Sequence, residues 1–149
     1  LIVNFFFSLY KPEVVQNLYQ KLDLSEMYQR NSAAFFSIYS FILVIAILKA
    51  VLFYDVVILV TKIDMEKPFS SFVSKQILTI SYYSFSIGMV SYIARKLAEY
   101  LEHRGFSNDN LNQFWEDSQA FILMAAVIYV IAVIFKKGVE LQNENDLTV

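Results

Sequence analysis

The chain has 149 residues, of which 57% are hydrophobic, and its 12 basic and 14 acidic side chains give a formal charge of −2. Soluble domains are about 45–50% apolar, so the chain is too apolar for an ordinary soluble domain. The lack of cysteine excludes disulfide scaffolds, cysteine-ligated metals and thiol chemistry. The near-neutral charge argues against direct binding of nucleic acid, which requires a basic excess.

The first ten residues are as apolar as a membrane span but only half as long. We expect residues 1–10 to be the end of a first span that is incomplete in this chain. A cleaved signal peptide is the alternative, but a basic n-region and a small-residue cleavage site are both missing. Residues 11–30 are polar, with apolar groups at helical spacing, and are expected to lie against the membrane surface or the other spans.

Three long apolar stretches follow, at residues 31–53, 76–94 and 118–135. At about 1.5 Å per residue, a helix over 76–94 is about 28 Å long, close to the roughly 30 Å of a hydrocarbon core. Lipid offers no partner to backbone polar groups, so such segments must be helical. We therefore predict an all-α integral membrane bundle of four transmembrane helices, the first incomplete, as a single domain over 1–149. The helices should extend past the lipid, to about Lys62 and about Arg104.

The second apolar segment stays apolar beyond its predicted lipid portion, until Val60, and Lys49 and Asp55 are its charged residues. Charges inside a span are functional candidates by default, since each costs at least about 2.5–3.5 kcal/mol at the bilayer centre. If the lipid portion ends at Phe53, however, Lys49 can extend its stem to the boundary and Asp55 lies at the interface. The two residues are about 120° from a common helix face, so they do not form a ready-made pair.

Small residues recur on one face of the third span at intervals of three or four: Ser81, Ser84, Gly88 and Ser91. Small faces let helices approach closely in lipid, and serine hydroxyls can bond across helices at about 0.6–2 kcal/mol each. We expect this face to pack against another helix, with Ala125 and Ala132 as a matching face. The alternative is a polar stripe that lines a permeation path.

The helical pattern of the third span continues beyond the lipid and is expected to stop at Gly105, a residue suited to the left-handed conformation. The fourth helix should then carry Phe114 and Trp115 towards the interface. Glu99 and His103 are four residues apart, which we interpret as a surface contact rather than a metal site. No catalytic motif occurs in the sequence, so we expect neither enzymatic activity nor a cofactor.

Two motifs resemble those of a known family. One is Lys67-Pro68-Phe69-Ser70, and the other is the terminal run GVELQNENDLTV from Gly138 to Val149. Together they resemble a family of small bacterial four-helix membrane proteins known as domain of unknown function twenty-nine seventy-five, with a PF loop after the second span and a G-x-x-L-Q-x-E-x-D-L-T-[IV] tail. The resemblance implies a bacterial cytoplasmic (inner) membrane protein whose loop and tail are cytoplasmic, and it supplies no established activity. Members are often encoded near a small helix-turn-helix regulator, which suggests a regulatory partner.

The loop and the tail supply the candidate partner-binding residues: Pro68, Phe69, Leu141, Asp146 and Leu147. Pro68 suits a helix start because of its fixed φ and missing N–H, and Phe69 should pack back towards the bundle. The tail is expected to dock on its own bundle or on another protein.

The predicted function is that of a non-catalytic accessory or regulatory subunit that binds another membrane or cytoplasmic protein. A small transporter or channel with a path lined by serine and tyrosine is the alternative. Such a path normally needs several inward polar groups or broken helices, and the spans contain few.

Overall fold

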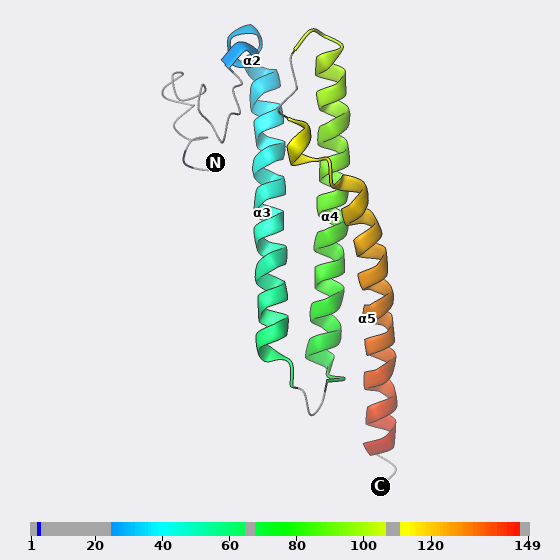
Figure 1. Ribbon diagram of the computed structural model, residues 1–149. Coiled ribbons are helices and arrows are strands. Elements are labelled where there is room, and N and C mark those ends of the chain that lie inside the picture. The colour runs from blue at the N-terminus through cyan, green and yellow to red at the C-terminus, as the bar shows by residue number, and fades with distance from the viewer. Residues whose placement is uncertain (1–2, 4–24, 65–67, 107–110, 147–149) are drawn as a thin grey trace. The chain divides into compact units, whose positions relative to one another are not determined.

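The computed structural model is all-helical over the residues that it describes, which are residue 3 and residues 25–64, 68–106 and 111–146 (Figure 1). Helix α2 (Ser25–Arg30) is followed by α3 (Ser32–Lys62), α4 (Ser71–Glu102), the short 3-10 helix η2 (Asn112–Phe114) and α5 (Ser118–Asp146). The predicted all-α class is confirmed. The expected partial first span, at residues 1–10, falls outside the described residues except for residue 3.

Three described helices are long and apolar enough to cross a membrane, and they contain the predicted spans 31–53, 76–94 and 118–135 almost entirely. Helix α4 has 32 residues, a length of about 48 Å, which exceeds the roughly 30 Å of a hydrocarbon core. The helices therefore continue beyond the predicted spans. Helix α3 ends at Lys62, as predicted, and α4 ends at Glu102, two positions before the predicted limit.

Side-chain oxygens cap the first turns of α3 and α4. Asn31 Oδ1 accepts a hydrogen bond from the Ala34 amide at 3.2 Å, and Ser70 Oγ accepts one from the Val73 amide, also at 3.2 Å. Each bond satisfies an amide that lacks a partner within its own helix. Pro68 lies three positions before Ser71, in the short segment that leads into α4, and Ser70 is the residue that caps the helix.

Gly105 ends α4 as predicted, with a φ of 84°. The Phe106 amide donates to the Leu101 carbonyl at 3.3 Å, and the Gly105 amide donates to the Glu102 carbonyl at 2.8 Å. This pair of bonds defines a Schellman motif, which gives hydrogen-bond donors to carbonyls at the end of the helix. The motif requires a residue in the left-handed conformation, and Gly105 is that residue. Arg30 Nη1 also donates to the Gly105 carbonyl, at 2.9 Å.

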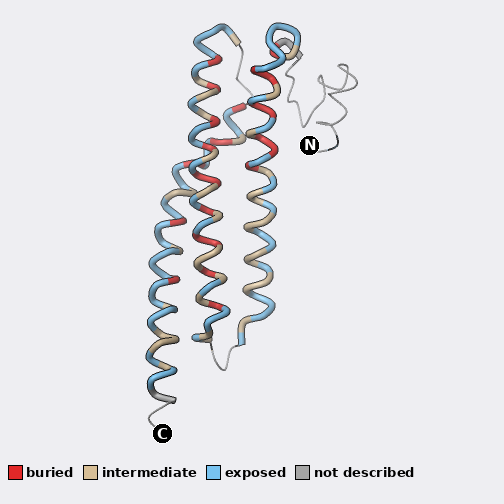
Figure 2. The backbone as a smooth tube through the Cα atoms, turned by 180° about the vertical axis from the view of Figure 1, so that it is seen from behind, coloured by how far each residue is buried: buried red, intermediate tan, exposed pale blue. Residues whose placement is uncertain are grey.

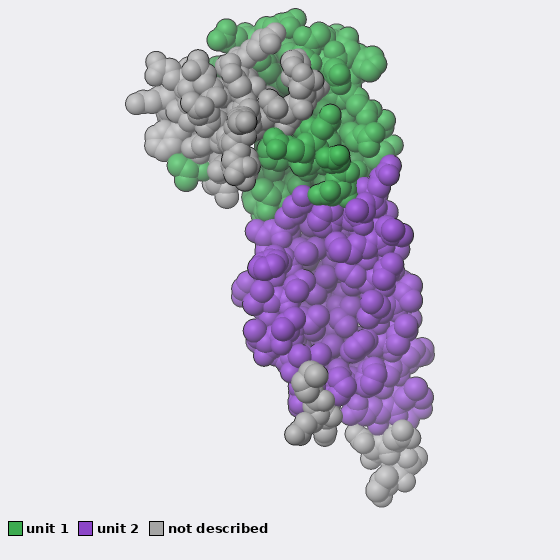
Figure 3. Space-filling model, in the orientation of Figure 1, with its two compact units in different colours: residues 1–47, 90–118 green, residues 48–89, 119–149 purple. Residues whose placement is uncertain are grey.

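The chain forms two compact units, coloured separately in Figure 3: residues 1–47 with 90–118, and residues 48–89 with 119–149. The core of the first unit joins the early part of α3 to the end of α4. Trp115, at 1% exposure, belongs to this core. The prediction that Trp115 faces the interface is wrong, because residues 112–114 form η2 and α5 begins only at Ser118.

The second unit packs α4 against α5 through a small cluster of Val73, Ile77 and Ala132. Figure 2 shows buried positions along α4 but only in the first half of α3, where they lie within residues 34–45. In the most apolar 18-residue stretch of α4, 44% of the residues are buried. The corresponding share is 11% in α3 and 17% in the last helix. Helices α3 and α5 thus expose large apolar side chains, which is typical of helices that face lipid or a partner helix.

Candidate functional site

The four small residues of α4 are all buried: Ser81, Ser84, Gly88 and Ser91. In the second unit, Ser81 Oγ donates a hydrogen bond of 3.0 Å to the Ala125 carbonyl of α5. Ala125 is 3% exposed and belongs to the small face that the sequence suggests as the match. A hydroxyl that bonds across two helices joins them directly.

Ser86 provides a contrast on the same helix. Its Oγ is exposed and donates to the Tyr82 carbonyl one turn earlier, at 2.8 Å. Such a bond stays within α4 and makes no link to another helix. The position on the helix, rather than the residue type, therefore determines which serine joins α4 to α5.

The two candidate charged residues of α3, Lys49 and Asp55, contact different helices. Lys49 Nζ lies 5.2 Å from the ring centroid of Phe121 on α5, within range of a cation–π interaction. Gln76 Nε2 of α4 donates to Asp55 Oδ1 at 3.1 Å and to the Asp55 carbonyl at 3.2 Å. The Gln76 contact was not predicted from the sequence, although a glutamine at the edge of a span is a polar group that needs a partner.

The loop before α4 packs against the end of α5. The rings of Phe69 and Phe135 have centroids 5.2 Å apart and are tilted by 44°. Phe69 also lies over Gly138, where an added methyl would come within 2.7 Å of Phe69 Cε1. Glycine lowers helix stability by about 1 kcal/mol relative to alanine, so its presence inside α5 is explained by this close approach. The sequence signal for the contact was a glycine next to the apolar span.

The tail continues α5 as a helix to Asp146, beyond the predicted span that ends at Phe135. Lys137 Nζ donates to Glu140 Oε2 at 2.7 Å. This hydrogen bond raises the pKa of Lys137 and lowers the pKa of Glu140. Leu141 is 61% exposed. The Asp146 side chain and the whole of Leu147 lie outside what the structure describes, so their predicted roles stay predictions.

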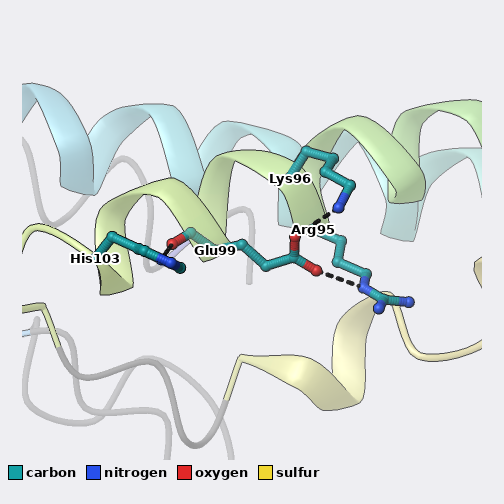
Figure 4. A network of polar contacts seen from close by, with 4 residues as sticks. All are labelled: Arg95, Lys96, Glu99 and His103. Atoms are coloured by element: carbon teal, nitrogen blue, oxygen red, sulfur yellow. Dashed lines mark hydrogen bonds and ion pairs between the residues drawn. The ribbon is translucent and has the colours of Figure 1, made fainter.

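A polar network occupies the end of α4 in the first unit (Figure 4). Glu99 accepts hydrogen bonds from Lys96 Nζ at 2.7 Å and from Arg95 Nε at 2.9 Å, and these bonds lower the pKa of Glu99. His103 Nδ1 lies 2.7 Å from the Glu99 carbonyl rather than near its carboxylate. Among the described residues, no group of three or more His, Cys, Asp or Glu side chains could hold a metal ion. The network is thus a set of contacts along one helix surface.

The comparison with known families matches the chain to one of them. The sequence profile of the family described as "Protein of unknown function (DUF2975)" matches residues 18–149, and the chain therefore belongs to this family. The match includes both motifs that carried the resemblance, the loop at Pro68 and Phe69 and the tail after Gly138. No curated protein and no solved structure matches the chain.

Proposed function

We propose that this member of the DUF2975 family is a non-catalytic accessory or regulatory subunit of the bacterial cytoplasmic membrane. In this proposal four helices span the bilayer. The subunit binds another protein, either a membrane complex or a helix-turn-helix regulator, on the cytoplasmic side. It does so through the loop-tail surface, which comprises Phe69, Phe135, Gly138 and Leu141.

Exposed apolar side chains beyond the predicted lipid region are the observation that carries the proposal. Phe69 is 41% exposed and Leu141 is 61% exposed. At about 1.5 Å per residue, each lies about 10 Å past the end of a predicted span, at Gln76 and Phe135 respectively. Lipid tails do not reach that far, so the exposure of Phe69 and Leu141 is better explained by a protein partner.

The loop-tail surface is also formed by contacts within the chain itself. Phe69 is held by its contacts with Phe135 and Gly138, and Leu141 lies on the regular helix α5. A surface that is already ordered loses less conformational entropy on association. This arrangement favours binding by a preformed surface over binding by a tail that folds only on contact with the partner.

The contacts of the serines on α4 favour a subunit over a small transporter or channel. Ser81 uses its hydroxyl to join α4 to α5, and Ser86 uses its hydroxyl within α4. Ser84 is 0% exposed. Ser81 lines a cavity beside α5, but its hydroxyl is already bonded to the Ala125 carbonyl and so contributes to packing, whereas a conducting path requires a row of polar groups that face an opening.

Site-specific photocrosslinking in native membranes tests the proposal. A photoreactive phenylalanine analogue replaces Phe69 or Leu141, and Tyr100 serves as the control because it is 54% exposed on the end of α4. We expect one protein to be captured in stoichiometric amount from positions 69 and 141 and not from position 100. Leu141→Glu should abolish its co-purification without lowering the melting temperature in detergent.

The identity of the captured protein separates the two kinds of partner. A membrane protein indicates an accessory subunit, and a helix-turn-helix protein indicates a regulator. Equal crosslinking at all three positions, or purification of a lone homo-oligomer that moves ions in liposomes, would overturn the proposal.

A further inference from the structure

A groove with two chemically different ends runs between α4 and α5 in the second unit. A cavity of about 480 Å³ is lined mainly by apolar side chains, including Phe85, Ile122 and Val130. A second cavity, of about 260 Å³, reaches Lys136 and Lys137. Tyr82 and Tyr129 line both cavities, so the two adjoin, and together they are here called the α4–α5 groove.

The apolar part of the α4–α5 groove has the length of one lipid leaflet. The apolar residues of α5 that line the two cavities run from Ile122 in the first to Val133 in the second, a rise of about 16 Å at 1.5 Å per residue. Half of a hydrocarbon core of roughly 30 Å is about 15 Å. Lys136 comes one helical turn later, just past the predicted end of the span at Phe135. A lipid tail that fills the apolar part would therefore place its headgroup beside Lys136.

The charged side chains that line the polar end are Lys136, Lys137 and Glu140, which together carry a net charge of +1. Lys137 donates to Glu140 at 2.7 Å, so its charge is largely balanced. Lys136 is exposed and makes no hydrogen bond within the described part of the chain. Basic groups between helices at the membrane surface bind anionic headgroups. The charge of this end is thus complementary to a phosphate.

We infer that the α4–α5 groove is a binding site for an anionic phospholipid, with an acyl chain along Ile122 to Val133 and the phosphate at Lys136. An apolar helix of a partner protein would fill the apolar part but would leave Lys136 unmatched. The inference rests on the membrane placement proposed above, and it concerns a face of α5 other than the loop-tail surface.

Native mass spectrometry of the purified full chain tests the inference. The protein is exchanged into detergent with equal amounts of phosphatidylglycerol and phosphatidylcholine that have the same acyl chains. We expect preferential retention of phosphatidylglycerol. Lys136→Gln should lower this preference about fivefold, the effect of removing one basic residue near an anionic surface. Lys62→Gln removes the same charge from the last turn of α3, outside the groove, and should change the preference less than twofold.

A second pair of variants tests the apolar part. Ala126 lines the groove, and Val127 is exposed beside it without lining it. Ala126→Trp should fill the groove and lower retention of both lipids, whereas Val127→Trp should not. Because both positions are exposed, neither variant places the new ring in the core.

Three results would overturn the inference: equal retention of the two lipids by the parent protein, equal effects of Lys136→Gln and Lys62→Gln, or full competition by glycerol phosphate without acyl chains. Retention is measured without any protein partner. Its failure would therefore leave crosslinking at Phe69 and Leu141 unaffected, and the failure of crosslinking would leave lipid retention unaffected.

Discussion

Replacing Gly138 with alanine sets two effects of similar size against each other. Alanine should stabilise α5 by about 1 kcal/mol, because glycine is the poorer helix former. The new methyl would lie within 2.7 Å of Phe69 Cε1 and 3.0 Å of Phe69 Cγ, so the ring must move. Its aromatic contact with Phe135 is worth about 0.5–1.5 kcal/mol. We therefore expect Gly138→Ala to change the free energy of unfolding by less than about 0.5 kcal/mol.

A Phe69→Ala background separates the two effects. Without the ring, Gly138→Ala retains only the helical gain and should stabilise the protein by about 1 kcal/mol. The double-mutant cycle then gives a coupling energy of about 0.5–1.5 kcal/mol. The assay is equilibrium unfolding in mixed detergent micelles, followed by far-UV circular dichroism. The reasoning is refuted if Gly138→Ala stabilises both backgrounds equally, since Phe69 and Gly138 would then not be in contact.

Three further predictions concern α4 and its end. Ser81→Ala removes the hydrogen bond to Ala125 and should lower the free energy of unfolding in detergent by about 0.6 kcal/mol, whereas Ser86→Ala, whose bond stays within the helix, should have a smaller effect. Gly105→Ala places a side chain at a φ of 84° and should cost about 1–2 kcal/mol, measured by the same unfolding titration. The lowered pKa of Glu99 means that its ion pairs stabilise the fold above the unfolded-state pKa and stop doing so as the pH falls through the folded-state value. The melting-temperature difference between the parent and Glu99→Gln should therefore decrease as the pH falls below the ordinary glutamate pKa of about 4.3, and it should shrink in high salt.

The long helices could be predicted from the sequence because their cause is local. A segment such as 76–94 lacks charge over a length that matches a bilayer, and only a helix satisfies its backbone in lipid. Gly105 was predictable for a similar reason, since a glycine after a run of helical spacing supplies the left-handed residue that ends a helix. Both signals depend on neighbouring residues and not on the tertiary structure.

Features that depend on residues far apart in the sequence could not be predicted in the same way. Gln76 lies 21 positions from Asp55, its hydrogen-bond partner, and nothing local to either residue specifies the pair. Trp115 has the amphipathic ring typical of a membrane interface, but the 3-10 turn at 112–114 delays α5 and places the ring in a core. The contact between Phe69 and Gly138 forms only when the segment before α4 packs against α5. The sequence alone therefore does not explain why a glycine occupies position 138.

Cysteine accessibility in intact cells is the most direct test of the membrane bundle with its loop-tail surface on the cytoplasmic side. The chain has no cysteine of its own, so single variants Leu141→Cys and His103→Cys each carry one reactive group. A membrane-impermeant maleimide should label His103→Cys in intact cells and should label Leu141→Cys only after the inner membrane is opened. Equal labelling of the two variants in intact cells would contradict the account.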